Sequence, residues 1–144
     1  MPLPDDHHVL RYVAPKHIDN GIINGSGFLR RPHEQASSVN WMEWFPLPIE
    51  NQVSGVRSVR RINYAKNGLL AQINVGSTKR YLEERAQLKL SFRHDPLPAK
   101  LDQAADPSHA LIHGLPALDG PRSELMLDLL AECIISQFPA VLDR

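Results

Sequence analysis

The sequence predicts an α+β fold in which a small, mostly antiparallel sheet packs against a long helix near the C-terminus and several shorter helices. Three observations favour this class. Residues 88–93 alternate apolar and polar side chains, which is the pattern of a half-buried strand. Residues 121–138 repeat apolar side chains every three or four positions, as an amphipathic helix does. Asn-Gly dipeptides at 20–21 and 24–25 mark tight turns, which favour antiparallel pairing of their neighbours.

The remaining strands follow from the same alternation. Residues 7–13, 69–75 and 109–113 have the pattern of strands, and a shorter strand is expected at 27–31. Together with 88–93 this gives a sheet of four or five strands. The chain has 144 residues, which suits one domain covering 1–144, and no segment has the length and composition of an interdomain linker.

Helices are expected at four places. The longest, 121–138, begins at a proline, which the first turn of a helix tolerates because its N–H groups have no partner within the helix. Shorter helices are expected at 39–45, 49–63 and 78–86. On the second of these, Arg57 and Arg61 are spaced i,i+4 and form a basic cluster with Arg60 and the nearby Lys66. A solvated helix face is the favoured interpretation, and a phosphate contact is the alternative.

Charge and composition exclude several classes of protein. The chain has 16 Lys and Arg against 16 Asp and Glu, so its formal net charge is zero, which argues against nucleic acid or an anionic membrane as its main partner. Cys133 is the single cysteine, so neither an internal disulfide nor a cysteine-rich zinc site can form. The N-terminus has no signal-peptide pattern and no apolar run is long enough to span a membrane, so a cytoplasmic location is expected.

Histidines supply the main candidate site. The sequence has seven, and His94, Asp95 and His109 stand at the two ends of the proline-rich loop that joins two expected strands. A pair of histidines with an acid can serve as general acid and base, so these three residues are the predicted catalytic set. The alternative is that they are ligands of a divalent metal such as zinc; otherwise no cofactor is expected. For any one histidine, a structural role bonded to backbone is the favoured interpretation.

Five further residues are predicted to contact a substrate. His7 and Arg11 share one face of the first expected strand, and Arg11 suits an anionic group such as phosphate. Asn40, Trp41 and Glu43 lie on the expected helix 39–45. On that helix Trp41, Trp44 and Phe45 would share a face, for which core packing is the favoured interpretation and a binding surface the alternative.

Two functions remain open. The chain has no metalloprotease, phosphate-loop, serine-hydrolase or dinucleotide-binding motif. The favoured hypothesis is therefore a non-catalytic binding or regulatory module, whose partner could be another protein or a second copy of itself. The aromatic face or the acidic stripe of Glu124, Asp128 and Glu132 would meet that partner. The alternative is a small histidine-based hydrolase or phosphodiesterase, metal-dependent or not, that acts on an anionic substrate.

Overall fold

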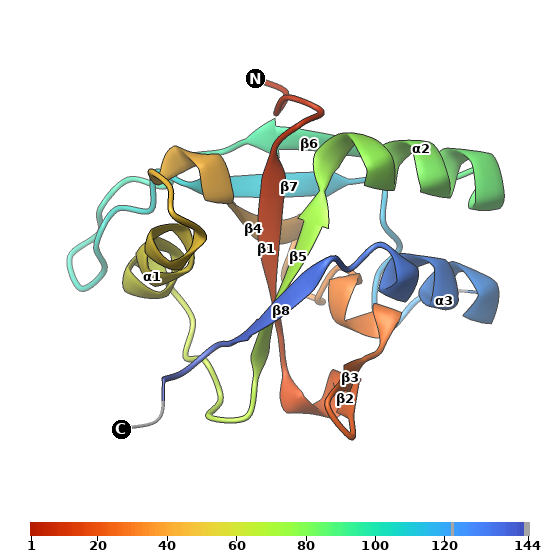
Figure 1. Cartoon of the computed structure of the whole chain (residues 1–144), viewed down its shortest axis with the longest axis horizontal. Coiled ribbons are helices and arrows are strands. Elements are labelled where there is room, and N and C mark those ends of the chain that lie inside the picture. Colours follow the sequence, from red (N-terminus) through yellow and green to blue (C-terminus); the bar gives the residue numbers. More distant parts are fainter. Residues whose placement is uncertain (122, 143–144) are drawn as a thin grey trace.

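A strongly twisted antiparallel sheet forms the centre of the molecule (Figure 1). The computed structural model describes residues 1–121 and 123–142. Six strands lie in the order β6-β7-β4-β1-β5-β8, and β2 and β3 form a separate hairpin. The strands are β1 His8–Val13, β2 Ile18–Asp19, β3 Ile22–Ile23, β4 Ser37–Trp41, β5 Leu69–Asn74, β6 Ser91–His94, β7 His109–His113 and β8 Ser136–Pro139. All pairs of neighbouring strands are antiparallel.

Helices cover both faces of this sheet. Helices α2 (Val75–Ala86) and α3 (Glu124–Glu132) lie on one side in Figure 1, and α1 (Ile49–Val59) lies on the other. The larger core cluster joins α2 and α3 to one face of the sheet, for example through Leu82, Leu130 and Ile112. The smaller cluster packs Val53 and Val56 of α1 on the opposite face, which we call the α1 face. The molecule is thus an α+β domain with two cores, as the sequence predicts in outline.

Several expected elements are confirmed and others are wrong. Residues 8–13, 69–74 and 109–113 are strands, and of the expected strand 88–93 only 91–93 is paired, within β6. Residues 75–86 are helical, whereas the expected helix 49–63 ends at residue 59. The prediction of a long C-terminal helix at 121–138 is wrong, because α3 spans only 9 residues. Ser123 caps its start by accepting a hydrogen bond from the Met126 N–H (2.9 Å), and the chain leaves the helix at Cys133 to form β8 beside β5. The apolar spacing of the sequence continued through both elements, so it did not reveal the boundary.

The expected helix 39–45 is also wrong. Residues 37–41 form strand β4 between β1 and β7, followed by a single 3-10 turn at Met42–Trp44. As a result, Trp41 packs against the α2–α3 core, Phe45 packs against the α1 core, and Trp44 is 46% exposed. The three aromatic side chains do not form the shared face that helical spacing predicts. The expected strand at 27–31 is absent as well: Gly25–Phe28 is a 3-10 helix.

The described residues contain no helix with the length and apolar character needed to cross a bilayer.

A buried arginine in the central strand β1 organises the neighbouring loop. Arg11 is 1% exposed and donates hydrogen bonds from Nε and both Nη atoms. It contacts the carbonyl oxygens of Gly27 (3.0 Å), Leu29 (2.9 Å) and Ser38 (2.8 Å), and its two Nη atoms lie 3.1 and 3.2 Å from the carboxylate oxygens of Glu34. The paired and hydrogen-bonded charge is tolerable in the core, whereas an unpaired one would not be. One side chain therefore fixes the path of residues 27–38.

The carboxylate of Glu34 receives further donors. The backbone N–H groups of Arg31 (2.8 Å) and Ser38 (2.9 Å) both donate to it. Burial acts to raise the pKa of Glu34, but the charge and hydrogen bonds of Arg11, with the two N–H groups, outweigh it and lower the pKa from 4.5 to about 2. A carboxyl group with a depressed pKa stabilises the fold above its unfolded pKa and loses that contribution as the pH falls through its folded pKa.

Acid unfolding tests the Arg11–Glu34 pair. We expect the free energy of unfolding to fall by about 3 kcal/mol between pH 4.5 and pH 2 from this group, since each pKa unit corresponds to about 1.4 kcal/mol. Glu34→Gln should lower stability at neutral pH by about 3–5 kcal/mol, because Arg11 would keep a buried charge without its partner. Urea unfolding at a series of pH values measures both effects. The exposed Glu84→Gln is the matched control, and equal behaviour of the two variants would contradict the assignment.

Candidate ligand-binding pocket

A cavity of about 330 Å³ lies on the α1 face of the sheet. Its walls come from β1, the segment 31–40, the segment 60–64 that follows α1, and residues 97–109. The lining includes Arg31, Arg60, Arg61, Tyr12, Tyr64 and Asp106, and we call this cavity the Tyr–Arg pocket. A more open groove of about 450 Å³ adjoins it and shares Arg60, Arg61 and Ile62. The volume of the Tyr–Arg pocket, about 330 Å³, is at the lower end of the range for small-molecule sites.

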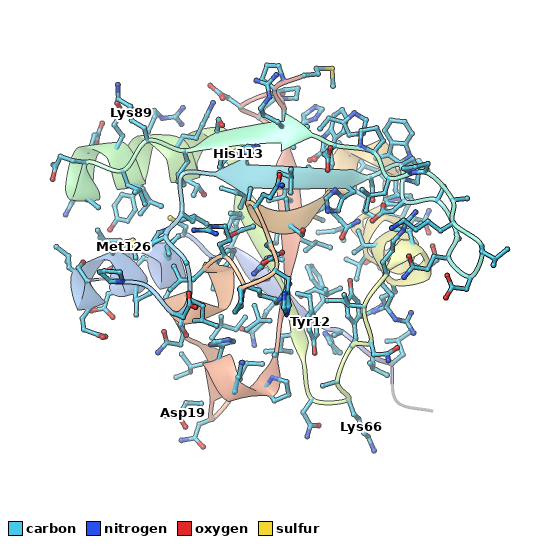
Figure 2. All side chains as sticks on the ribbon, turned by 180° about the vertical axis from the view of Figure 1, so that it is seen from behind. Tyr12, Asp19, Lys66, Lys89, His113 and Met126 are labelled. Carbon is cyan, nitrogen blue, oxygen red and sulfur yellow. The ribbon has the colours of Figure 1, made fainter. Side chains whose placement is uncertain are left out.

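Two stacked tyrosines form one wall. The rings of Tyr12, from β1, and Tyr64 lie 4.4 Å apart at an interplanar angle of 10°; Tyr12 is labelled in Figure 2. The Arg31 guanidinium lies 5.9 Å from the centre of the Tyr12 ring, and that of Arg60 lies 5.4 Å from the Tyr64 ring. Such cation–ring contacts hold long arginine side chains in place. The wall therefore presents two positive charges beside two flat apolar rings.

The Tyr64 hydroxyl stays protonated at neutral pH. Burial raises the pKa of Tyr64 to about 12; the positive charge of Arg60 opposes this shift, and the negative charge of Asp106 supports it. A neutral phenol can both donate and accept a hydrogen bond.

Arg61 connects the pocket to the loop between β6 and β7. Its Nη2 donates to the carbonyl oxygens of Pro98 and Ala104 (3.0 Å for the latter). That loop is itself a small hairpin, because the backbones of Leu97 and Asp106 exchange two hydrogen bonds of 2.9 Å. Among the residues that the structure describes, the Arg61 Nε is one of a few buried side-chain atoms without a hydrogen-bond partner. A buried, unpartnered donor on a cationic group is unfavourable until an acceptor reaches it.

Asp106 forms the polar floor of the pocket. It is 3% exposed and accepts hydrogen bonds from Asn40 Nδ2 (2.9 Å to Oδ2, 3.2 Å to Oδ1) and from the Ser108 N–H (3.1 Å) and hydroxyl (2.8 Å) at Oδ1. Asn40 Nδ2 also donates to the Ser108 hydroxyl oxygen at 2.8 Å. Strand pairing brings Asn40 close to Asp106 and Ser108, since Asn40 of β4 lies opposite His109 at the start of β7. The predicted substrate contact Asn40 thus does line the pocket.

Two of the three residues of the predicted catalytic set, His109 and Asp95, contact each other, and His109 lines the pocket. His109 Nδ1 lies 2.9 Å from the carbonyl oxygen and 3.2 Å from the carboxylate Oδ2 of Asp95, and the His109 side chain is 12% exposed. With Nδ1 donating to Asp95, the other ring nitrogen, Nε2, is the proton acceptor of the neutral imidazole. The ring of His109 is thus oriented by the backbone carbonyl of Asp95, with the carboxylate as a second close contact, and His109 also lines the pocket.

His94 does not join them. It pairs with Ala110 in the β6–β7 register, so its side chain lies on the opposite face of the sheet from that of His109. Its Nε2 lies 2.7 Å from the carbonyl oxygen of Pro107, and its ring lies 5.1 Å from Trp41 and 5.4 Å from Trp44. The described part of the chain contains no group of three His, Cys, Asp or Glu side chains that could hold a metal ion. The structure therefore does not assemble the three predicted metal ligands.

The other predicted substrate contacts also lie outside the pocket. The Trp41 Nε1–H donates to Nδ1 of His7 (2.9 Å), and these rings continue the cluster of His94 and Trp44. Glu43 accepts from the backbone N–H of His8 and pairs with its ring nitrogen, both at 2.7 Å. Arg11 is buried and bound to Glu34, which leaves its guanidinium no free N–H for a substrate anion.

Sequence reasoning missed most of the arginines and tyrosines of the pocket. A signal was present for Arg60 and Arg61, because both belong to the basic cluster in the last part of the expected helix 49–63. No local pattern could identify Arg31, Tyr12 or Tyr64, since they come together only when β1, β4 and the segment after α1 pack on one another.

No protein-family model, curated protein or solved structure matches this chain. The interpretation of the pocket therefore depends on its geometry and chemistry.

Alkaline titration tests the environment of Tyr64. We expect one of the three tyrosines to ionise near pH 12, and the Tyr64→Phe variant to lose that component of the phenolate absorbance. Because the folded pKa is raised, this group should also destabilise the fold as the pH rises from 10 towards 12. Tyr81→Phe, which changes a tyrosine on α2, is the control. An unchanged titration near pH 12 in Tyr64→Phe would show that the ring is not held as described.

Proposed function

We propose that this chain is a non-catalytic binding module that takes a small anionic ring compound in the Tyr–Arg pocket. The observation that carries the proposal is the set of three arginines, Arg31, Arg60 and Arg61, around one cavity. Arginine is the side chain best suited to carboxylate and phosphate groups, since its planar fork can donate two parallel hydrogen bonds.

The shape and lining support a ring rather than a simple inorganic ion. Tyr12 and Tyr64 contribute apolar ring surface to the lining, and Leu97 and Ile62 add further apolar surface. Small-molecule sites combine such walls with a few polar groups that fix orientation. A cavity of about 330 Å³ suits one ring with one acidic substituent.

The charge balance also supports an anion. Glu34 lines the pocket but is paired with the buried Arg11, and Asp106 is held by Asn40 and Ser108. Arg31 pairs with the same Glu34 carboxylate at 3.5 Å, whereas Arg60 and Arg61 bond to neutral backbone carbonyl oxygens such as those of Arg57 and Ala104. Among the described residues, the positive charges of Arg60 and Arg61 have no ion-pair partner and can act on a ligand.

Binding of phenyl phosphate tests this proposal. Calorimetric titration should detect binding of phenyl phosphate, with phenol at least tenfold weaker, and the affinity should fall as salt is added. Arg61→Gln should weaken binding by roughly ten- to a hundredfold, because a charged hydrogen bond contributes about 1.5–3 kcal/mol. Arg60→Gln is a second variant that leaves the loop contacts of Arg61 intact, and the exposed Arg80→Gln is the control. Equal affinities for phenyl phosphate and phenol, or no binding of either, would contradict the proposal.

A second candidate function is supported by the His109–Asp95 pair. In a hydrolase that acts on an anionic ester, His109 Nε2 would take a proton from water while the water oxygen bonds to phosphorus or carbon and the ester oxygen leaves. The arginines of the pocket would hold the anionic group. The position of His109 on the wall of the same pocket favours this candidate over a site elsewhere.

Hydrolysis of para-nitrophenyl phosphate and its bis-ester distinguishes the two candidates. If the second holds, His109→Gln should lower the rate of para-nitrophenolate release by roughly a hundredfold or more, the usual contribution of a general base. His113→Gln, on the same strand and the same face but exposed, is the matched control. Absence of turnover by the unchanged protein, with and without added zinc, would remove the hydrolase and leave the binding module.

A further inference from the structure

The buried carboxylate of Asp106 has an unequal set of partners. Three donors reach Oδ1, from the Ser108 N–H, the Ser108 hydroxyl and Asn40, whereas Oδ2 accepts only from Asn40. The two oxygens of a carboxylate together offer about four acceptor positions. Oδ1 is thus saturated by the turn at 106–108, and Oδ2 keeps an acceptor position available.

No cation within the described residues neutralises this carboxylate. Arg31, Arg60 and Arg61 line the same pocket, yet the ion pairs of the described residues do not include Asp106. Burial of an ionised carboxylate is costly unless a charge or several donors compensate it. The side chain is 3% exposed, so bulk water satisfies it poorly. An additional donor inside the pocket would lower that cost.

The surroundings of Oδ2 suit a donor on a ring. Tyr64, whose protonated hydroxyl is sensitive to the charge of Asp106, lines the same cavity, and Asn40 fixes the orientation of the carboxylate. A buried acceptor in a binding pocket discriminates strongly between ligands, because a ligand without a donor leaves it unpaired. The arginines thus require an acidic group on the ligand, whereas Asp106 requires a hydrogen-bond donor on the same ligand.

We infer that the ligand of the Tyr–Arg pocket is an amino- or imino-substituted aromatic anion whose N–H group donates to Asp106 Oδ2 while its acidic group binds the arginines. The inference rests on the proposed function, since it specifies the ligand class of the same pocket. It excludes anionic rings with only alkyl substituents as good ligands. Aminoaryl acids and the phosphates of amino-bearing heterocycles both belong to the class.

Matched probes test the inference without any variant. Titrations compare para- and meta-aminophenyl phosphate with para- and meta-tolyl phosphate, in which a methyl group of similar size replaces the amino group. We expect one amino isomer to bind at least tenfold more tightly than the methyl compound of the same substitution pattern, which corresponds to one hydrogen bond to a charged acceptor. Equal affinities within both pairs would overturn the inference while leaving the proposed function intact. Absence of binding by all four compounds, and by phenyl phosphate, would refute the proposed function itself.

A variant assigns the preference to Asp106. Asp106→Asn keeps the size and one acceptor oxygen but removes the charge, so the preference for the amino compound over the methyl compound should shrink to less than threefold, while any change in phosphate affinity should be common to both compounds. The exposed Asp119→Asn is the control and should retain the full preference. Thermal unfolding accompanies each titration, because Asp106 also holds the turn at 106–108. A folded Asp106→Asn protein with an unchanged preference would place the donor contact elsewhere and overturn the assignment.

Discussion

The structure depends on one buried ion pair, Arg11 with Glu34. A guanidinium placed in the central strand of the sheet must be paired and hydrogen-bonded, and here all of its donors bind the segment 27–38. That requirement fixes a loop which has little regular structure of its own. The loop then delivers Arg31 and Glu34 to the pocket on the α1 face, although Arg11 itself lies in the sheet behind it. Arg11 was predicted to bind a substrate anion, but it instead fixes the loop that forms one wall of the candidate site.

The pocket is assembled from segments far apart in the sequence. Strand pairing sets Asn40 beside the start of β7, the turn at 106–108 presents Asp106, and Arg61 holds the β6–β7 loop against the segment that follows α1. The result is a cavity with cationic, aromatic and anionic groups in one small volume. Binding and hydrolysis are compatible with the same architecture because His109, oriented by Asp95, stands on its wall. The separate cluster of His7, Trp41, Trp44 and His94 occupies the other face of the sheet.

Part of the candidate site was predictable from the sequence. Asp95 and His109 end the strands that flank one loop, and antiparallel pairing of those strands brings loop ends together. The inclusion of His94 was wrong for a geometric reason, because successive side chains of a strand point to opposite faces and His94 pairs with Ala110. Asn40 was selected for a helix that does not exist, yet it reaches the pocket from β4. Glu43 instead contacts His8, and His7 instead accepts a hydrogen bond from Trp41.

The sequence by itself determined the α+β class, most strands of the sheet and the two helices at 49–59 and 75–86, because local alternation and helical spacing act over a few residues. Only the tertiary structure decided where α3 ends, since β8 forms by pairing with β5, sixty or more residues away along the chain. The same holds for the pocket. Arg31, Tyr64 and Asp106 have no common motif, and only the packing of β1, β4, the segment after α1 and the β6–β7 loop places them around one cavity.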